Sequence, residues 1–169
     1  MDFIAGADER WQSDKILFPT DGHSMPLVQK SALVPYSSAK MFALVDDVER
    51  YPEFLPWCGG ARLLSRDASI TVAQIDINYL GIRQSFTTAN TRTVNENMQI
   101  HLREGPFKTL DGEWQFVALG GAGCKVALRL EYAFANAVLE TALGPVFGMI
   151  ANTMIECFVA RADTLYADA

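Results

Sequence analysis

The C-terminal part of the chain, from Cys124 to Tyr166, reads CKVALRLEYAFANAVLETALGPVFGMIANTMIECFVARADTLY. Apolar and polar residues alternate as far as Phe134, and this period of two is typical of a half-buried β-strand. From Asn136 onward the apolar residues recur at helical spacing instead, and Asn136 is a favourable N-cap. The sequence therefore predicts a strand followed directly by one long terminal helix.

The residues before this strand show the same alternation in several further segments. Residues 59–134 as a whole predict a series of antiparallel strands with one apolar and one solvated face. Residues 27–35 predict an earlier strand, and residues 38–48 a short helix with an apolar stripe. The order of these elements predicts an α+β fold in which a curved antiparallel sheet wraps around the long C-terminal helix.

Composition limits the class of protein. The chain has 169 residues, 50% of them hydrophobic, which suits one domain with a substantial core. Its net charge of −6 argues against a broad nucleic-acid-binding surface. Cys58, Cys124 and Cys157 form no C-x-x-C pair, so we expect free thiols in a reducing cytoplasm and no metal site.

The first 24 residues differ from the rest of the chain. They are acidic, show no sustained period, and end in the turn-forming segment Thr20–Ser24. We predict a poorly ordered extension over residues 1–24 and a single ligand-binding domain over residues 25–169. The chain has no run of about 18 apolar residues and no signal sequence at its start. We therefore expect a cytoplasmic protein, either free or peripheral to the inner membrane.

Short motifs distributed along residues 27–166 provide a further indication. They are SALVPYS (31–37), MFALV (41–45), YPEFLPWC (51–58), GPFK (105–108) and MIECFVARA (154–162). In this order they resemble the ribosome association toxin and coenzyme Q-binding protein family of START-like domains, within the polyketide cyclase/dehydrase and lipid transport superfamily. The resemblance implies a START-like helix-grip fold, in which the sheet grips the last helix over an apolar cavity.

The implied cavity would be lined by the apolar faces of the strands and of the last helix, together with the segment 51–57. The expected ligand-binding residues are Phe54, Leu55, Trp57, Ile75, Ile77, Phe86, Met98, Ile100, Phe107, Trp114, Leu128, Leu143, Phe147, Ile150 and Met154. A packed core without a ligand is the alternative interpretation of the same aromatic and aliphatic side chains.

Two functions are implied by the resemblance. The first is binding of a hydrophobic small molecule, with ubiquinone or another lipid as the expected ligand, in support of respiration. The alternative is a toxin that binds the large ribosomal subunit and blocks subunit joining. Neither requires a cofactor. We predict no enzymatic activity, because the chain has no P-loop, G-x-S-x-G or H-E-x-x-H motif and His101 lies on the polar face of its strand.

Two surface features leave alternatives open. The segment Tyr51–Trp57 is unusually apolar for a loop, so it is either a plug over one end of the sheet, or a lid or membrane-touching edge. Six cations in the predicted sheet region are either dispersed solvated side chains or, if they meet, a basic patch for rRNA or anionic lipid heads. They are Arg62, Arg66, Arg83, Arg92, Arg103 and Lys108. The sequence carries no signal for the oligomeric state.

Overall fold

The computed structural model describes residues 11–17, 27–121 and 123–167. From residue 27 onward their order confirms the predicted strand, short helix, antiparallel strands and long terminal helix. The elements are β1 (Trp11–Leu17), β2 (Leu27–Val34), α2 (Ser38–Asp46), the 3-10 helix η1 (Val48–Glu53), β3 (Cys58–Arg66), β4 (Ile70–Tyr79), β5 (Ile82–Thr93), β6 (Asn97–Glu104), β7 (Phe107–Ala118), β8 (Cys124–Phe134) and α3 (Ala137–Tyr166).

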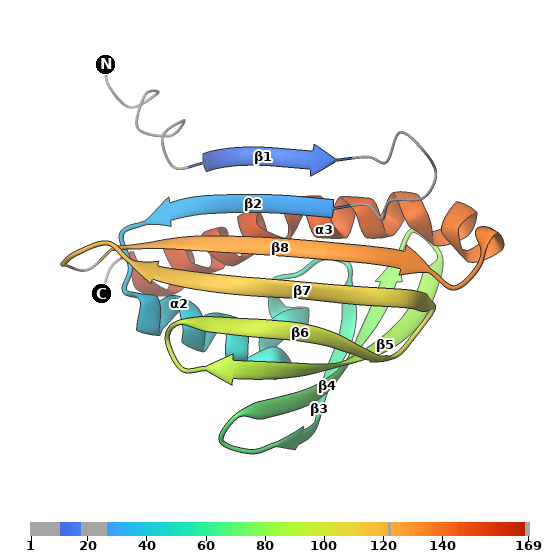
Figure 1. Cartoon of the computed structure of the whole chain (residues 1–169), viewed down its shortest axis with the longest axis horizontal. Coiled ribbons are helices and arrows are strands. Elements are labelled where there is room, and N and C mark those ends of the chain that lie inside the picture. The colour runs from blue at the N-terminus through green and yellow to red at the C-terminus, as the bar shows by residue number, and fades with distance from the viewer. Residues whose placement is uncertain (1–10, 18–26, 122, 168–169) are drawn as a thin grey trace.

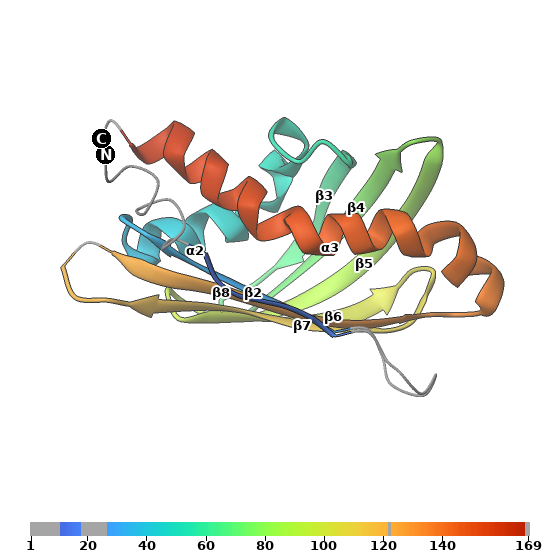
Figure 2. The same ribbon diagram turned by 90° about the horizontal axis from the view of Figure 1, so that it is seen from above.

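The strands form one sheet of eight strands in the order β1-β2-β8-β7-β6-β5-β4-β3. Every neighbouring pair is antiparallel. Figures 1 and 2 show that α2 and α3 lie on the same side of this curved sheet, with α3 running along its concave face. The predicted α+β helix-grip arrangement is confirmed.

Strand β1 lies where the sequence analysis predicted no regular element. It pairs with β2 at the edge of the sheet, and its register shifts between Gln12 and Lys15. An edge strand can be held by backbone hydrogen bonds alone, so it needs no apolar–polar alternation. The rest of the predicted N-terminal extension, residues 1–10 and 18–24, lies outside the described residues, and its order stays a prediction.

Helix α3 supplies one side of the core. Asn136 caps it, because its side-chain oxygen accepts a hydrogen bond from Leu139 N at 2.9 Å. The helix continues through Pro145, whose missing N–H leaves the carbonyl of exposed Thr141 to solvent. By length and composition α3 could cross a membrane. Here it is a core helix, and the side chains it buries are Leu143, Phe147, Ile150, Ala151, Ile155, Phe158, Val159 and Ala162.

Strands β7 and β8 approach closely at Gly112. A Cβ atom at this position would lie 2.6 Å from Leu130 Cδ2 and 2.7 Å from the backbone oxygen of Arg129. The leucine side chain can rotate, but the paired backbone cannot withdraw. We predict that Gly112→Ala lowers the free energy of unfolding by about 1–3 kcal/mol, measured by urea denaturation.

The matched control for this substitution is Gly144→Ala in α3. A Cβ atom at Gly144 would meet nothing within 4 Å, and alanine favours a helix over glycine by about 1 kcal/mol. Gly144→Ala should therefore leave the stability unchanged or raise it. Equal effects of the two substitutions would contradict the close approach at Gly112.

Candidate functional site

A small cavity lies between the concave face of the sheet, η1 and α3. Its volume is about 70 Å³. By comparison, an apolar cavity of about 150 Å³ can bind a molecule as small as benzene. The residues lining the cavity are Val48, Tyr51, Trp57, Ala73, Ile75, Phe86, Thr88, Asn90, Ile100, Leu110, Trp114, Leu130, Phe147 and Met154.

The structure divides the expected ligand-binding residues into three groups. Those that line the cavity are Trp57, Ile75, Phe86, Ile100, Trp114, Phe147 and Met154. A separate gap of about 10 Å³ lies near one end of the sheet and is lined by Ile77, Phe107 and Leu143, together with Phe147. The remainder pack in the core without lining the cavity: Phe54, Leu55, Met98, Leu128 and Ile150.

Two lining residues that the sequence analysis missed are polar. Thr88 and Asn90 follow Phe86 at intervals of two along β5, so all three side chains share the concave face. The period predicts their positions on this face, but the sequence analysis assigned only apolar side chains to the cavity. Both are buried.

The cavity wall carries a hydrogen-bond donor and an acceptor without partners among the described residues. They are the indole Nε1 of Trp57 and the side-chain oxygen Oδ1 of Asn90. The amide nitrogen of Asn90 reaches only the sulfur of Met98, at 3.7 Å. An unsatisfied buried polar group costs about 1–3 kcal/mol. A bound molecule that reached either atom would remove part of this cost.

The segment Tyr51–Trp57 closes one end of the cavity. Leu55 and Trp57 are each 2% exposed, and Phe54 packs against the core. The Tyr51 hydroxyl donates to the carbonyl of Val45, and burial raises the pKa of this phenol, which keeps it neutral. This burial agrees with the plug interpretation. Phe54 is only partly buried, so the interpretation as a lid or membrane-touching edge stays a prediction.

The six cations considered in the sequence analysis do not meet in one patch. Arg66 and Arg92 both turn to Asp46 at the end of α2, at 3.5 and 3.2 Å. Arg62 donates a hydrogen bond to Gln74 on the neighbouring strand at 3.1 Å. The other three, Arg83, Arg103 and Lys108, are exposed.

A larger side chain at a position that lines the cavity tests for empty space there. Ala73 on β4 lines it, whereas Ala32 on β2 is fully buried and does not. We predict that Ala73→Val is neutral or stabilising, because the two added carbons enter empty space. Ala32→Val should cost about 1–3 kcal/mol, because it overpacks a filled site. Equal losses in thermal denaturation would show that the space at Ala73 is already occupied.

The buried thiols give a pH-dependent prediction. Burial raises the pKa of Cys58 and of Cys124 from 9.0 to about 11. In the unfolded chain these thiols ionise two pH units earlier, so the native state loses stability as the pH rises from 9 to 11.

The same shift predicts slow alkylation. At pH 8 the native thiolate fraction of Cys58 and Cys124 should be about a hundredfold smaller than in the unfolded chain. Iodoacetamide labelling followed by peptide mass spectrometry checks this, with the urea-unfolded chain as the reference. Equal labelling rates in the two states would contradict the burial of these thiols.

The described residues contain no group of three or more His, Cys, Asp or Glu side chains that could hold a metal ion. The exposed His101 lies beside Asp111, with Nδ1 and Oδ1 3.3 Å apart, on the convex face of the sheet. That position is remote from the cavity, so His101 has no access to a molecule bound there.

Known proteins resemble this chain over most of its length. The model of the family described as polyketide cyclase/dehydrase and lipid transport matches residues 34–159. A protein of Vibrio cholerae named ribosome association toxin RatA is 43% identical over 144 residues, which cover 85% of this chain and 100% of that protein.

Two more distant proteins extend the comparison. The mitochondrial coenzyme Q-binding protein COQ10 of Dictyostelium discoideum is 24% identical over 159 residues, 89% of this chain and 78% of that protein. The solved structure of a START superfamily protein from Mycobacterium smegmatis superposes with a TM-score of 0.69 at 21% identity. That superposition covers 82% of this chain and 98% of the other.

Proposed function

Because the chain belongs to the ribosome association toxin and coenzyme Q-binding protein family of START-like domains, we propose that it acts by binding the ribosome. In this proposal it binds the large subunit and blocks subunit joining. The observation that carries the proposal is the match to a protein named as a ribosome association toxin along that protein's entire length. Full coverage means that no domain of the relative has to be supplied from elsewhere.

The small volume of the cavity agrees with this choice over a carrier. Ligand pockets for molecules of drug size have volumes of roughly 300–1,000 Å³, whereas the cavity under α3 is about 70 Å³. A quinone would enter only if α3 or the plug at Tyr51–Trp57 moved outward. Surface binding to a large partner requires no such movement. We also propose that the chain works by binding rather than by catalysis.

Sedimentation tests the proposal. The purified full chain is mixed with isolated large or small ribosomal subunits at low salt and centrifuged through a sucrose cushion. We expect the chain to pellet with large subunits in a saturable manner and to remain in the supernatant alone. A chain that stays in the supernatant with both subunits would contradict the proposal.

A second candidate function, binding of a hydrophobic molecule with a polar head, is favoured by one specific observation. Trp57 and Asn90 line the apolar cavity, and Trp57 Nε1 and Asn90 Oδ1 are buried without partners among the described residues. A carbonyl such as that of ubiquinone would accept a hydrogen bond from Trp57. Extraction of the purified protein and mass spectrometry checks this candidate. A quinone recovered from the wild type but not from Trp57→Phe supports it, and recovery from both counts against the tryptophan contact.

A further inference from the structure

Cations of this protein fall into two classes, those with an anionic, polar or aromatic partner and those without. Most of the described lysine and arginine side chains are paired. The paired cations are Lys30 with Glu156, Lys40 with the Tyr166 ring, Arg50 with Asp47 and Glu53, Arg62 with Gln74, Arg66 and Arg92 with Asp46, Arg129 with Glu131, and Arg161 with Glu53.

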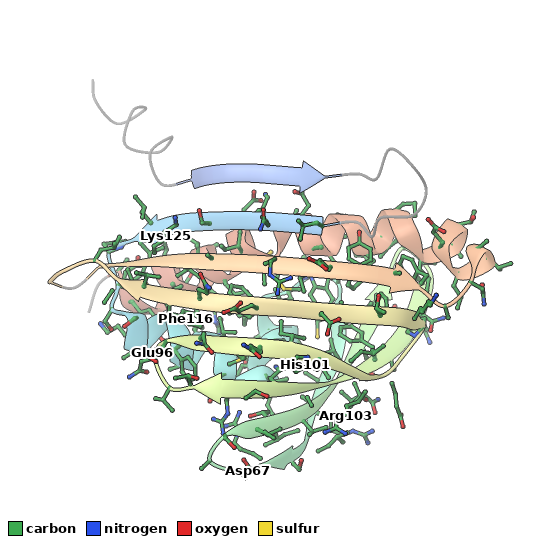
Figure 3. All side chains as sticks on the ribbon, in the orientation of Figure 1. Asp67, Glu96, His101, Arg103, Phe116 and Lys125 are labelled. Atoms are coloured by element: carbon green, nitrogen blue, oxygen red, sulfur yellow. The ribbon has the colours of Figure 1, made fainter. Side chains whose placement is uncertain are left out.

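Within the described side chains, Arg83, Arg103, Lys108 and Lys125 have no such partner. The first three, which we call the basic end, lie at two turns at the same end of the sheet. Arg83 begins β5 after the turn at Leu80–Gly81, while Arg103 and Lys108 flank the turn between β6 and β7. Lys125 begins β8 at the other end of the sheet, and Figure 3 shows it far from Arg103.

Backbone packing holds the turn between β6 and β7 against β5, the strand that carries Arg83. A Cβ atom on Gly105 would lie 2.7 Å from Cβ of Phe86, so the turn between β6 and β7 rests directly on β5. Thr87 pairs with Glu104 in the same place. The three cations lie on the exposed phase of their strands, opposite the buried phase of Phe86 and Phe107. The basic end is therefore a fixed group of charges.

The local charge of the basic end contrasts with that of the chain. Three free cations share this end with one exposed carboxylate in the same turns, that of Glu104, whereas the whole chain carries −6. The neighbouring exposed side chain of Asn78 can hydrogen bond, whereas the Ser85 hydroxyl already donates to Asp76 at 2.6 Å. Arginine and lysine together with such groups contact nucleic-acid phosphates and sugars. Unpaired cations in a negative protein also orient its approach to a polyanion.

Resting on the proposed ribosome binding, we infer that the basic end is the surface that contacts rRNA, through its phosphate backbone. Leu80 and Val138 are 81% and 77% exposed near this end, but single exposed apolar residues are normal on protein surfaces. The recognition is electrostatic and independent of base sequence. Three phosphate contacts predict that affinity falls roughly twenty- to fortyfold between 50 and 200 mM salt.

The test is sedimentation with large subunits of two matched variants of the full chain. One variant carries Arg83→Glu, Arg103→Glu and Lys108→Glu, and the control carries Lys125→Glu, which reverses the free cation at the opposite end. Both variants must first show the same thermal unfolding midpoint as the wild type. We expect the triple variant to lose at least tenfold in affinity and the control to bind like the wild type. Arg103→Gln alone should lower the slope of log K against log salt by about one.

The outcomes separate the surface from the proposed function. If the triple variant still sediments like the wild type, the basic end is not the RNA contact, while ribosome binding stands. If the wild type itself fails to sediment, the proposed function falls and the inference falls with it. If the triple reversal leaves sedimentation intact but abolishes binding to phosphatidylglycerol vesicles, the surface contacts anionic lipid, and the rRNA assignment is overturned.

Discussion

Replacing Phe158 with alanine is expected to lower the free energy of unfolding by about 3–5 kcal/mol. The Phe158 ring is 1% exposed and lies at the centre of an aromatic cluster. Its centroid is 5.3, 5.1 and 5.1 Å from those of Tyr51, Phe54 and Trp114, and all three contacts are edge-on. One side chain of α3 thus joins the plug segment to β7, so its removal would leave a void that no single element can fill.

Two further variants make the Phe158 prediction specific. Phe158→Leu keeps most of the volume and should cost less than about 1.5 kcal/mol. Val138→Ala, on the exposed side of the same helix, should change stability by no more than about 0.5 kcal/mol. Urea denaturation measures all three. A loss below about 1.5 kcal/mol for Phe158→Ala would mean that the plug does not depend on α3.

The second large effect is expected at Asp46. This carboxylate holds Arg92, whose side chain is only 9% exposed, at 3.2 Å and contacts Arg66 at 3.5 Å. Removing one partner of a buried pair leaves a desolvated charge behind, and Asp46→Ala should cost about 3 kcal/mol. The neighbouring Asp47 pairs with Arg50 in solvent, so Asp47→Ala should cost less than about 1 kcal/mol.

Denaturation of both variants at low and high salt checks the Asp46 prediction. The loss from Asp46→Ala should persist at high salt, because buried pairs are screened little, whereas any effect of Asp47→Ala should fade. Similar losses for the two variants would contradict the difference in burial between the two ion pairs.

The sequence predicted those helices and strands in which apolar residues recur at one regular spacing. The helical period after Asn136 continues without a break, so α3 was predictable to within a residue at each end. Strand β1 was missed because an edge strand held by its backbone leaves no such pattern. Asp46 and Arg92 are paired across 46 residues of sequence, and no local pattern indicates which cation a carboxylate will meet.

The alternation along each strand predicted which residues face the cavity, but it did not predict that some of them are polar. Ile75, Phe86 and Trp114 line the cavity as the alternation predicts. Thr88 and Asn90 lie on the same concave face, but the sequence analysis assigned only apolar side chains to the cavity. Ile150 was assigned to the cavity by helical spacing but packs elsewhere in the core, because spacing identifies a buried face and not the gaps within it.

Reassociation of ribosomal subunits tests the central claim most directly. Isolated small and large subunits are mixed at a magnesium concentration that favours joining, with and without a molar excess of the purified chain, and resolved on a sucrose gradient. The proposed function predicts that the joined particle decreases with added chain, while free subunits accumulate and the chain migrates with the large one. An undiminished joined particle in the presence of excess folded chain would contradict it.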